Sequence, residues 1–268
     1  MRNFIQDIVP VVPFVSFSSN KLPEFKFNDF NCEKLILQES ISSGGNGTHL
    51  LCHDECDNYL KNKNSEESYI ISPYLNNSIP INVHLVIFDD DCIVFPVSHQ
   101  IIYNENDFFC FIGSDFLTDF SDKIYDDILV NSNKIGNELR KIGYRGVCGI
   151  DYLIKNNNIY FLEVNPRFQA STFLLNNHLI EIGIPSIQEL NIMAFSHVKK
   201  PFNSFSKFEK CKSYFNIIKD ESRFIEYAES KNEFQVFLDG YNKSYSVNED
   251  YLYKFRIIMN RNISWEIS

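Results

Sequence analysis

One stretch of this chain constrains its fold more than any other: two apolar runs, 147–154 and 159–164, on either side of a polar tip. The tip at 155–158 reads K-N-N-N, and both runs are rich in β-branched and aromatic residues. This pattern predicts an antiparallel β-hairpin. Pro166 cannot donate to a sheet ladder, so we expect strand pairing to end there.

Two carboxylates lie within this apolar hairpin. Asp151 is inside the first run, and Glu163 is near the end of the second. Asn165 and Arg167 follow Glu163 at alternate positions, on its own face if the strand continues. Buried carboxylates need a partner, and these oxygen ligands suit Mg²⁺ that carries nucleotide phosphates, beside a forked donor on Arg167. In the alternative interpretation, the acids are solvated on a surface hairpin and Arg167 forms a salt bridge.

The hairpin reads G-x-x-G-I-D-Y-L…Y-F-L-E-V-N-P-R-F-Q, which resembles the metal-binding signature of the ATP-grasp superfamily. The sequence of this motif is close to that of the biotin carboxylase branch and of carboxylate–amine ligases. The resemblance implies an α+β ATP-grasp fold, with two α+β subdomains and the nucleotide between them. It implies that Asp151, Glu163 and Asn165 hold Mg²⁺, with Mn²⁺ as an alternative, on ATP. It also implies that Arg167 is catalytic and steadies the transferred phosphate.

A glycine-rich segment lies upstream, between the expected strands 34–39 and 49–52. A loop of this kind can close its backbone N–H groups over phosphates, although such clusters are also plain turns. The resemblance implies nucleotide binding by residues in and beside this loop: Gln38, Ser43, Gly44, Gly45, Gly47 and Thr48. The family usually has Lys where Gln38 stands, and a second family Lys would lie before Met1, so both lysine contacts to phosphate are in question.

The resemblance also implies an adenine and ribose site further along the chain. Tyr74 and Leu75 follow an expected strand, 68–72, at the family's hinge, where they either line the adenine pocket or serve as ordinary core residues. His99 and Gln100 match a His-Gln pair that lies near ribose and phosphate in biotin carboxylase-like chains. A lone His on a strand is also often a hydrogen-bonded core residue. A hydrophobic Ile101 replaces the family's next basic residue, so bicarbonate chemistry is not supported.

The rest of the chain supplies further expected elements. Strands are expected at 82–88, 91–97, 108–112 and 213–218, and helices at 54–63, 121–142, 170–182, 186–196 and 221–230. We expect Ser171 or Thr172 to cap the third of these helices, and Ser186 with Glu189 to form a capping box. The expected organisation is a lead-in (1–31), a small subdomain with the flap (32–75), a large subdomain with the metal site (76–200) and a C-terminal α/β extension of unassigned role (201–268).

Composition and charge argue against some classes of binding partner. The 268 residues are 44% hydrophobic and carry a formal net charge of −10, which argues against nucleic acid as a partner. No run of 18 apolar residues occurs, so neither a transmembrane helix nor a membrane partner is expected. Seven cysteines form no even framework, which favours free thiols and a cytoplasmic location.

The leading hypothesis is an ATP-dependent ligase that activates a carboxylate as an acyl phosphate and joins it to an amine. Its substrates would be small molecules or peptides. A second hypothesis is a non-catalytic or degenerate nucleotide-binding module, which Gln38 and Ile101 favour, and a third is a small-molecule kinase. Only eight residues precede a V-P-x-V-P-like segment that follows a whole N-terminal domain in the family. We therefore expect that domain to be lacking. The chain is then either a shortened ligase or one in which a partner chain or self-association replaces the missing part.

Overall fold

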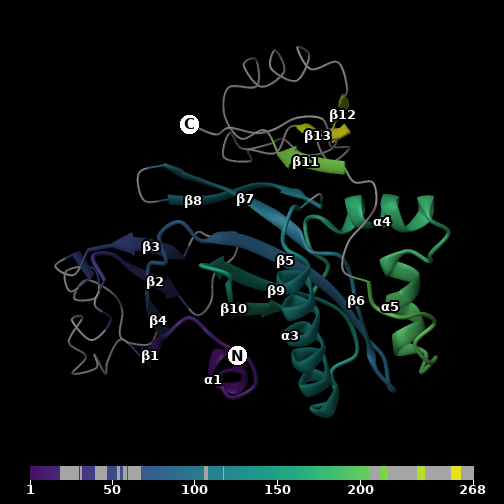
Figure 1. Cartoon of the computed structure of the whole chain (residues 1–268), viewed down its shortest axis with the longest axis horizontal. Coiled ribbons are helices and arrows are strands. Elements are labelled where there is room, and N and C mark those ends of the chain that lie inside the picture. Colours follow the sequence, from purple (N-terminus) through teal and green to yellow (C-terminus); the bar gives the residue numbers. More distant parts are fainter. Residues whose placement is uncertain are drawn as a thin grey trace, which may run out of the picture.

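The computed structural model describes residues 1–18, 30, 32–39, 47–52, 55–56, 59, 68–105, 108–116, 118–205, 212–216, 234–238 and 255–260. Within these ranges the chain forms an α+β fold with two β-sheets, as the sequence predicts. A small four-stranded sheet lies beside a larger nine-stranded sheet, and helices pack on both faces of the larger one (Figure 1).

The small sheet has the strand order β1-β4-β2-β3, and all of its neighbouring strands are antiparallel. Its core is formed by alternate residues that point to one side, among them Leu35, Leu37, Tyr69 and Ile71. The expected strands of this region are confirmed, and the segment expected as a lead-in supplies the edge strand. The strands are β1 (Val15–Ser18), β2 (Leu35–Glu39), β3 (Thr48–Leu51) and β4 (Ser68–Pro73).

The large sheet has the order β10-β9-β5-β7-β8-β11-β13-β12, with β6 paired to β5. The predicted hairpin and the predicted strands of the central region are confirmed. Residues from the expected C-terminal extension continue this sheet as β11, β13 and β12. The strands are β5 (Ile79–Ile87), β6 (Cys92–Val94), β7 (Ser98–Glu105), β8 (Phe108–Asp115), β9 (Gly146–Lys155), β10 (Asn158–Asn165), β11 (Lys212–Asn216), β12 (Phe234–Leu238) and β13 (Phe255–Asn260).

Strand alternation separates the two apolar layers of the large sheet. Odd-numbered residues of β5 pack under α3 (Asp122–Lys141) and beside α1 (Arg2–Ile5). Even-numbered residues such as Val86 face α4 (Thr172–Glu181) and α5 (Ile187–Phe195). The helices at 121–142, 170–182 and 186–196 are therefore confirmed. None of the described helices is long and apolar enough to cross a membrane.

The first residues of α4 and α5 show whether the predicted capping interactions form. Ser186 and Glu189 form the predicted capping box at the start of α5. The predicted side-chain cap of α4 is wrong, because Ser171 makes no capping hydrogen bond. Thr172 instead accepts a hydrogen bond from the backbone N–H of Gln169, at 2.9 Å, which fixes the turn before the helix. The expected helix at 221–230 and most of the one at 54–63 lie outside the described residues.

The hairpin tip is a two-residue loop with positive φ at both positions, 51° at Asn156 and 61° at Asn157. Lys155 pairs with Asn158 across it. This is the geometry of a type I′ turn, whose twist matches that of the flanking strands. Asn tolerates the left-handed region better than other residues with a side chain, which explains the asparagines of the tip.

We expect Asn157→Val to lower the free energy of unfolding by about 1–2 kcal/mol, because a β-branched residue is strained at positive φ. The matched control is Asn158→Val, one residue later in an extended, exposed strand position. Urea unfolding measures both variants. Equal effects at the two positions would contradict the turn assignment.

Candidate functional site

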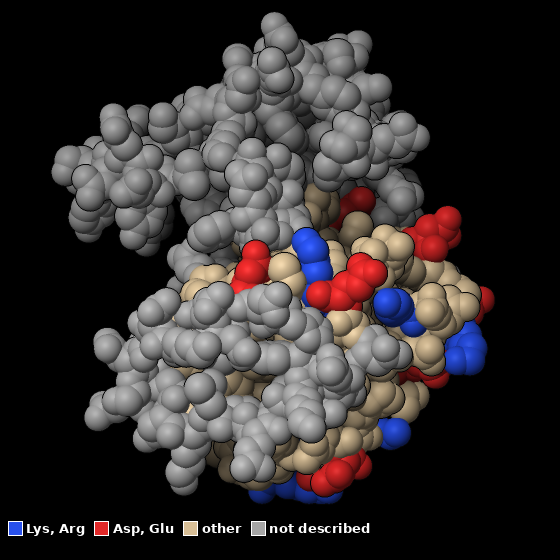
Figure 2. Space-filling model, turned by 90° about the vertical axis from the view of Figure 1, so that its left-hand side faces the viewer, with Lys and Arg blue, Asp and Glu red and all other residues tan. Residues whose placement is uncertain are grey.

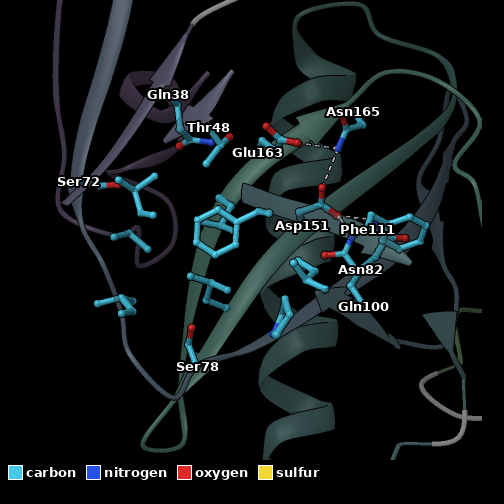
Figure 3. Close-up of a pocket in the computed structure, with 18 of the residues that line it drawn as sticks. Gln38, Thr48, Ser72, Ser78, Asn82, Gln100, Phe111, Asp151, Glu163 and Asn165 are labelled. Carbon is cyan, nitrogen blue, oxygen red and sulfur yellow. Dashed lines mark hydrogen bonds between the residues drawn. The ribbon is translucent and has the colours of Figure 1, made fainter. Parts of the chain in front are cut away.

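A pocket of about 540 Å³ lies between the two sheets. Gln38, Thr48 and Ser72 line it from the small sheet, and Asp151 and Asn82 line it from the large sheet (Figure 3). Residues far apart in sequence thus meet because the two sheets face each other across this space. The predicted nucleotide position between two subdomains corresponds to this pocket.

A β-bulge at Leu162 decides which side chain lies opposite Asp151. Tyr152 pairs with Phe161, and at the same register the next pair would be Asp151 with Leu162. The register instead shifts by one residue, so that Glu163 pairs with Asp151. A bulge of this kind places two residues opposite one and re-aims the side chains that follow. The extra residue therefore brings the two carboxylates and Asn165 together on the pocket face.

Neutral amides surround the Asp151 carboxylate. Its Oδ1 accepts hydrogen bonds from Asn82 Nδ2 at 2.6 Å and from Gln100 Nε2 at 3.1 Å, and its Oδ2 accepts one from Asn165 Nδ2 at 2.8 Å. Asn165 Nδ2 also donates to Glu163 Oε1 at 3.2 Å (Figure 3). We refer to Asn82, Gln100 and Asn165 as the amide cradle. It fixes the carboxylate in position without neutralising its charge.

The pocket disfavours a negative charge on Asp151. Burial, and then the neighbouring charge of Glu163, raise the pKa of Asp151 to about 7, although the amide hydrogen bonds act in the opposite direction. Asp151 is half-buried and lines the pocket, whereas Glu163, which also lines it, is exposed. Two carboxylates in this setting repel each other, and a bound cation relieves that repulsion.

The donor set fits a hard divalent cation. Asp151, Glu163 and the amide oxygen of Asn165 are oxygen ligands, the type that Mg²⁺ and Mn²⁺ prefer. Beside them, the buried Asn82 Oδ1 has no hydrogen-bond partner among the described residues. The described part of the chain contains no cluster of three or more His, Cys, Asp or Glu side chains that could bind a metal. Two carboxylates with amide oxygens are the candidate ligands here.

Part of the pocket wall is apolar. Tyr74 and Leu75, which the sequence predicts at the adenine site, line the pocket together with Phe109 and Phe111. The ring centroids of Tyr74 and Phe109 are 6.2 Å apart. Aromatic side chains and oxygen ligands in one pocket suit a molecule with a flat base and an anionic tail.

The segment after β10 carries Arg167 to the pocket. The exposed Arg167 side chain lines the pocket, and its Nη1 donates to the carbonyl oxygen of Phe168 at 3.1 Å. The Gln169 side chain packs over Gly149, where an added Cβ would lie 2.4 Å from Gln169 Cδ. Its Nε2 donates to the carbonyl oxygens of Arg167 and Asn165, at 2.7 and 3.3 Å. Gln169 thus holds the turn that presents Arg167.

The remaining predicted nucleotide-binding residues differ in whether they line the pocket. Gln38, Thr48 and Gln100 line the pocket. Gly47 is buried beside it, and its carbonyl oxygen accepts a hydrogen bond from the N–H of Glu39 at 2.9 Å. The other predicted loop residues, Ser43, Gly44 and Gly45, lie outside the described residues.

The structure does not bring His99 to the pocket. Successive residues of a strand face opposite sides, so His99 faces away while Gln100 faces Asp151. Its backbone lies opposite Ile81 on one neighbouring strand and Asp115 on the other. Burial lowers the pKa of His99, despite the opposing charge of Asp115. His99 is therefore a half-buried residue that does not line the pocket.

Among the pocket residues that were not predicted from the sequence, two contribute polar groups to this site. Asn82 is a polar residue within a mostly apolar strand, and that position was a usable signal. Arg2 is 5% exposed, and its guanidinium group reaches the pocket from α1. Nothing in the sequence around Arg2 distinguishes it from a surface arginine.

The described surface carries mixed charge on the face that Figure 2 shows. Basic and acidic side chains are interspersed there, without a continuous basic patch among the described residues (Figure 2). Phosphate backbones are bound by extended basic surfaces, and this face presents none within that part of the chain.

Comparison with known proteins identifies the fold. A family model described as an ATP-grasp domain matches residues 9–171. The chain is 24% identical over 148 residues to the [butirosin acyl-carrier protein]–L-glutamate ligase of Niallia circulans, an alignment that covers 53% of this chain and 35% of that protein.

Two solved structures illustrate the similarity in three dimensions. The ADP complex of N5-carboxyaminoimidazole ribonucleotide synthetase superposes with a TM-score of 0.74 at 14% identity, over 98% of this chain and 66% of that one. The biotin carboxylase domain of Hydrogenobacter thermophilus 2-oxoglutarate carboxylase, solved with MgADP and bicarbonate, gives 0.70 at 13% identity, over 97% and 60%. At these identities the likeness establishes the fold, and the chain spans less than two thirds of each relative.

We expect Asp151→Asn to raise the melting temperature of the ligand-free protein at pH 8. Because folding raises the pKa of Asp151 from 3.8 to about 7, the free energy of unfolding falls as the pH rises across that window and is lowest above it. The variant has no carboxylate at this position, so it avoids this loss of stability. Its gain in melting temperature over wild type should therefore be smaller at pH 5.

Thermal melting at both pH values, without metal or nucleotide, measures the effect. Asp126→Asn, which alters an exposed carboxylate on α3, is the control and should show no such pH dependence. A destabilisation by Asp151→Asn of equal size at pH 5 and pH 8 would contradict the electrostatic account.

Proposed function

The chain belongs to the ATP-grasp family, and from this we propose that it is an ATP-dependent ligase. In the proposed reaction a substrate carboxylate is activated as an acyl phosphate and then joined to an amine. The single observation that carries the proposal is the meeting of Asp151, Glu163 and Asn165 in a pocket that aromatic side chains also line.

The pocket suggests how ATP would lie. The adenine base would pack against Tyr74, Leu75 and Phe109, and the phosphates would extend toward Asp151 and Glu163. Gln38 and Thr48 would contact the phosphates from the small sheet. The predicted contribution of Ser43, Gly44 and Gly45 stays a prediction.

A divalent cation completes the proposed site. Asp151, Glu163 and the amide oxygen of Asn165 would hold Mg²⁺ or Mn²⁺. When bound, this ion neutralises negative charge that develops on the transferred phosphoryl group. The amide cradle keeps Asp151 in place for this role. Its hydrogen-bond donors are neutral, so they do not compete with the metal ion for the carboxylate as a cationic side chain would.

The proposed chemistry proceeds in two displacements. An oxygen of the substrate carboxylate attacks the γ-phosphorus in line, and the bond to ADP breaks. The amine then attacks the acyl carbon, loses a proton, and expels phosphate. Arg167 would donate hydrogen bonds to the phosphoryl oxygens in the first step, where charge-assisted donors lower the barrier most.

The names of similar proteins support a ligase and leave the substrates open. One relative is named as a glutamate ligase acting on an acyl-carrier protein, and a neighbour of known structure is an L-amino acid ligase from Bacillus licheniformis. We propose small molecules or peptides that carry a carboxylate and an amine as the substrates.

We expect Glu163→Gln to lower turnover about a hundredfold or more, because it removes a ligand charge needed during phosphoryl transfer. Substrate-dependent phosphate release measures this. Glu138→Gln, which alters a surface ion pair with Lys141, is the matched control and should retain full activity. A Glu163→Gln variant that keeps more than about a tenth of the rate would rule out the metal assignment.

Product analysis in the same assay separates the alternatives. A ligase yields free phosphate together with a new amide, whereas a small-molecule kinase yields a phosphorylated product. ATP binding without turnover across carboxylate and amine pairs would favour a non-catalytic nucleotide-binding module.

A further inference from the structure

The arginine at position 2 has an unusual environment for its residue type. It is 5% exposed and lines the pocket between the sheets. Its Nε donates to the carbonyl oxygen of Leu162 at 2.9 Å, and its Nη2 donates to Gln38 Oε1 at 2.6 Å. The third nitrogen, Nη1, is buried and has no hydrogen-bond partner among the described residues.

A buried guanidinium N–H group without an acceptor is unfavourable, more so because the group is charged. The other two nitrogens are fixed by their hydrogen bonds, so Nη1 cannot turn away without breaking them. An acceptor brought by a ligand would satisfy it. Arg2 lines the pocket, so a ligand bound there is the candidate source of this acceptor.

With a divalent cation bound, the charged side chains of the pocket would favour an anion. Among its described lining residues the cations are Arg2 and Arg167, and the anions are Asp151 and Glu163. A polyphosphate chain carries more negative charge than one divalent ion cancels, so it needs cationic donors from the protein. Gln38 is uncharged, and it points into the pocket from the small sheet (Figure 3).

We propose that Arg2 is a phosphate-binding residue of the nucleotide site, with its free Nη1 donating to a phosphate oxygen of ATP. This inference rests on the function proposed above. Arg2 supplies the positive charge that Gln38 lacks, and it does so from α1 rather than from the small sheet. Its Nη2 keeps the Gln38 side chain oriented toward the same phosphates.

The same side chain also connects the two halves of the site. Arg2 holds the carbonyl of the bulge residue Leu162 on β10 and the side chain of Gln38 on β2. A phosphate on Nη1 would add a third contact. A purely structural Arg2 would hold the bulge and Gln38 equally well with or without phosphates in the pocket, and this difference can be measured.

The test is calorimetric titration of the whole chain with ATP and with AMP, both in excess Mg²⁺. We expect Arg2→Gln to raise the Kd for ATP about tenfold or more, the effect of losing a charge-assisted hydrogen bond, and the Kd for AMP by less than about threefold. Arg2→Lys should fall between wild type and Arg2→Gln, because an ammonium keeps the charge but loses the fork. If Arg2→Gln does not fold, Arg2→Lys decides by the same ATP-to-AMP ratio.

A rescue variant and a matched control sharpen the result. In Arg2→Gln, a second change, Gln38→Lys, should restore ATP affinity selectively, since residue 38 lies within hydrogen-bond distance of the lost guanidinium. Arg140→Gln is the control. Arg140 is a partly buried arginine outside the pocket that also has a buried nitrogen, Nε, without a partner among the described residues.

The outcomes separate this inference from the proposed function. Wild type that binds ATP, with Arg2→Gln weakening ATP and AMP equally or not at all, would overturn the role of Arg2 and leave the proposed function standing. Wild type that binds no ATP would overturn the proposed function, and this inference with it.

Discussion

The bulge at Leu162 is the constraint on which the rest of the site depends. Strand pairing has a period of two, so a one-residue change in register moves every later side chain to the other face. The shift places Glu163 opposite Asp151, with Asn165 on the same face. The carbonyl oxygen of the bulge residue, Leu162, accepts a hydrogen bond from Arg2. One inserted residue therefore sets both the acidic cluster and the anchor of the basic side chain beside it.

The second feature is the way the acidic cluster is supported. Side chains from β5, β7 and β10 bond to Asp151 through neutral amide groups. A lysine in any of these positions would stabilise the carboxylate more, and it would also compete with a metal ion. In the ligand-free protein, burial and then the neighbouring charge of Glu163 raise the pKa of Asp151. Unfavourable electrostatic environments that shift a pKa are typical of functional sites.

Features that depend on local sequence were predictable. The hairpin, its carboxylates, the helix periodicities and the capping box of α5 all follow from residues close together in the chain. His99 does not line the pocket, because strand alternation assigns it to the face opposite Gln100. The bulge was not predicted, because the two apolar runs indicate regular strands, in which Glu163 would share the buried face of Ile159 and Phe161. Arg2 was missed because its environment is made by β2 and β10, 36 and 160 residues away. The partner chain stays a prediction.

The central claim is that the two sheets hold a metal–nucleotide complex at Asp151 and Glu163. Thermal melting of wild type and Glu163→Gln with saturating ATP, with and without excess Mg²⁺, tests it most directly. At a hundredfold excess over Kd, binding adds about 2.7 kcal/mol, roughly 5–10 °C for a chain of this size. The account predicts a shift that requires Mg²⁺ and is lost in the variant. A shift of equal size in both proteins, or none at millimolar ATP, would contradict it.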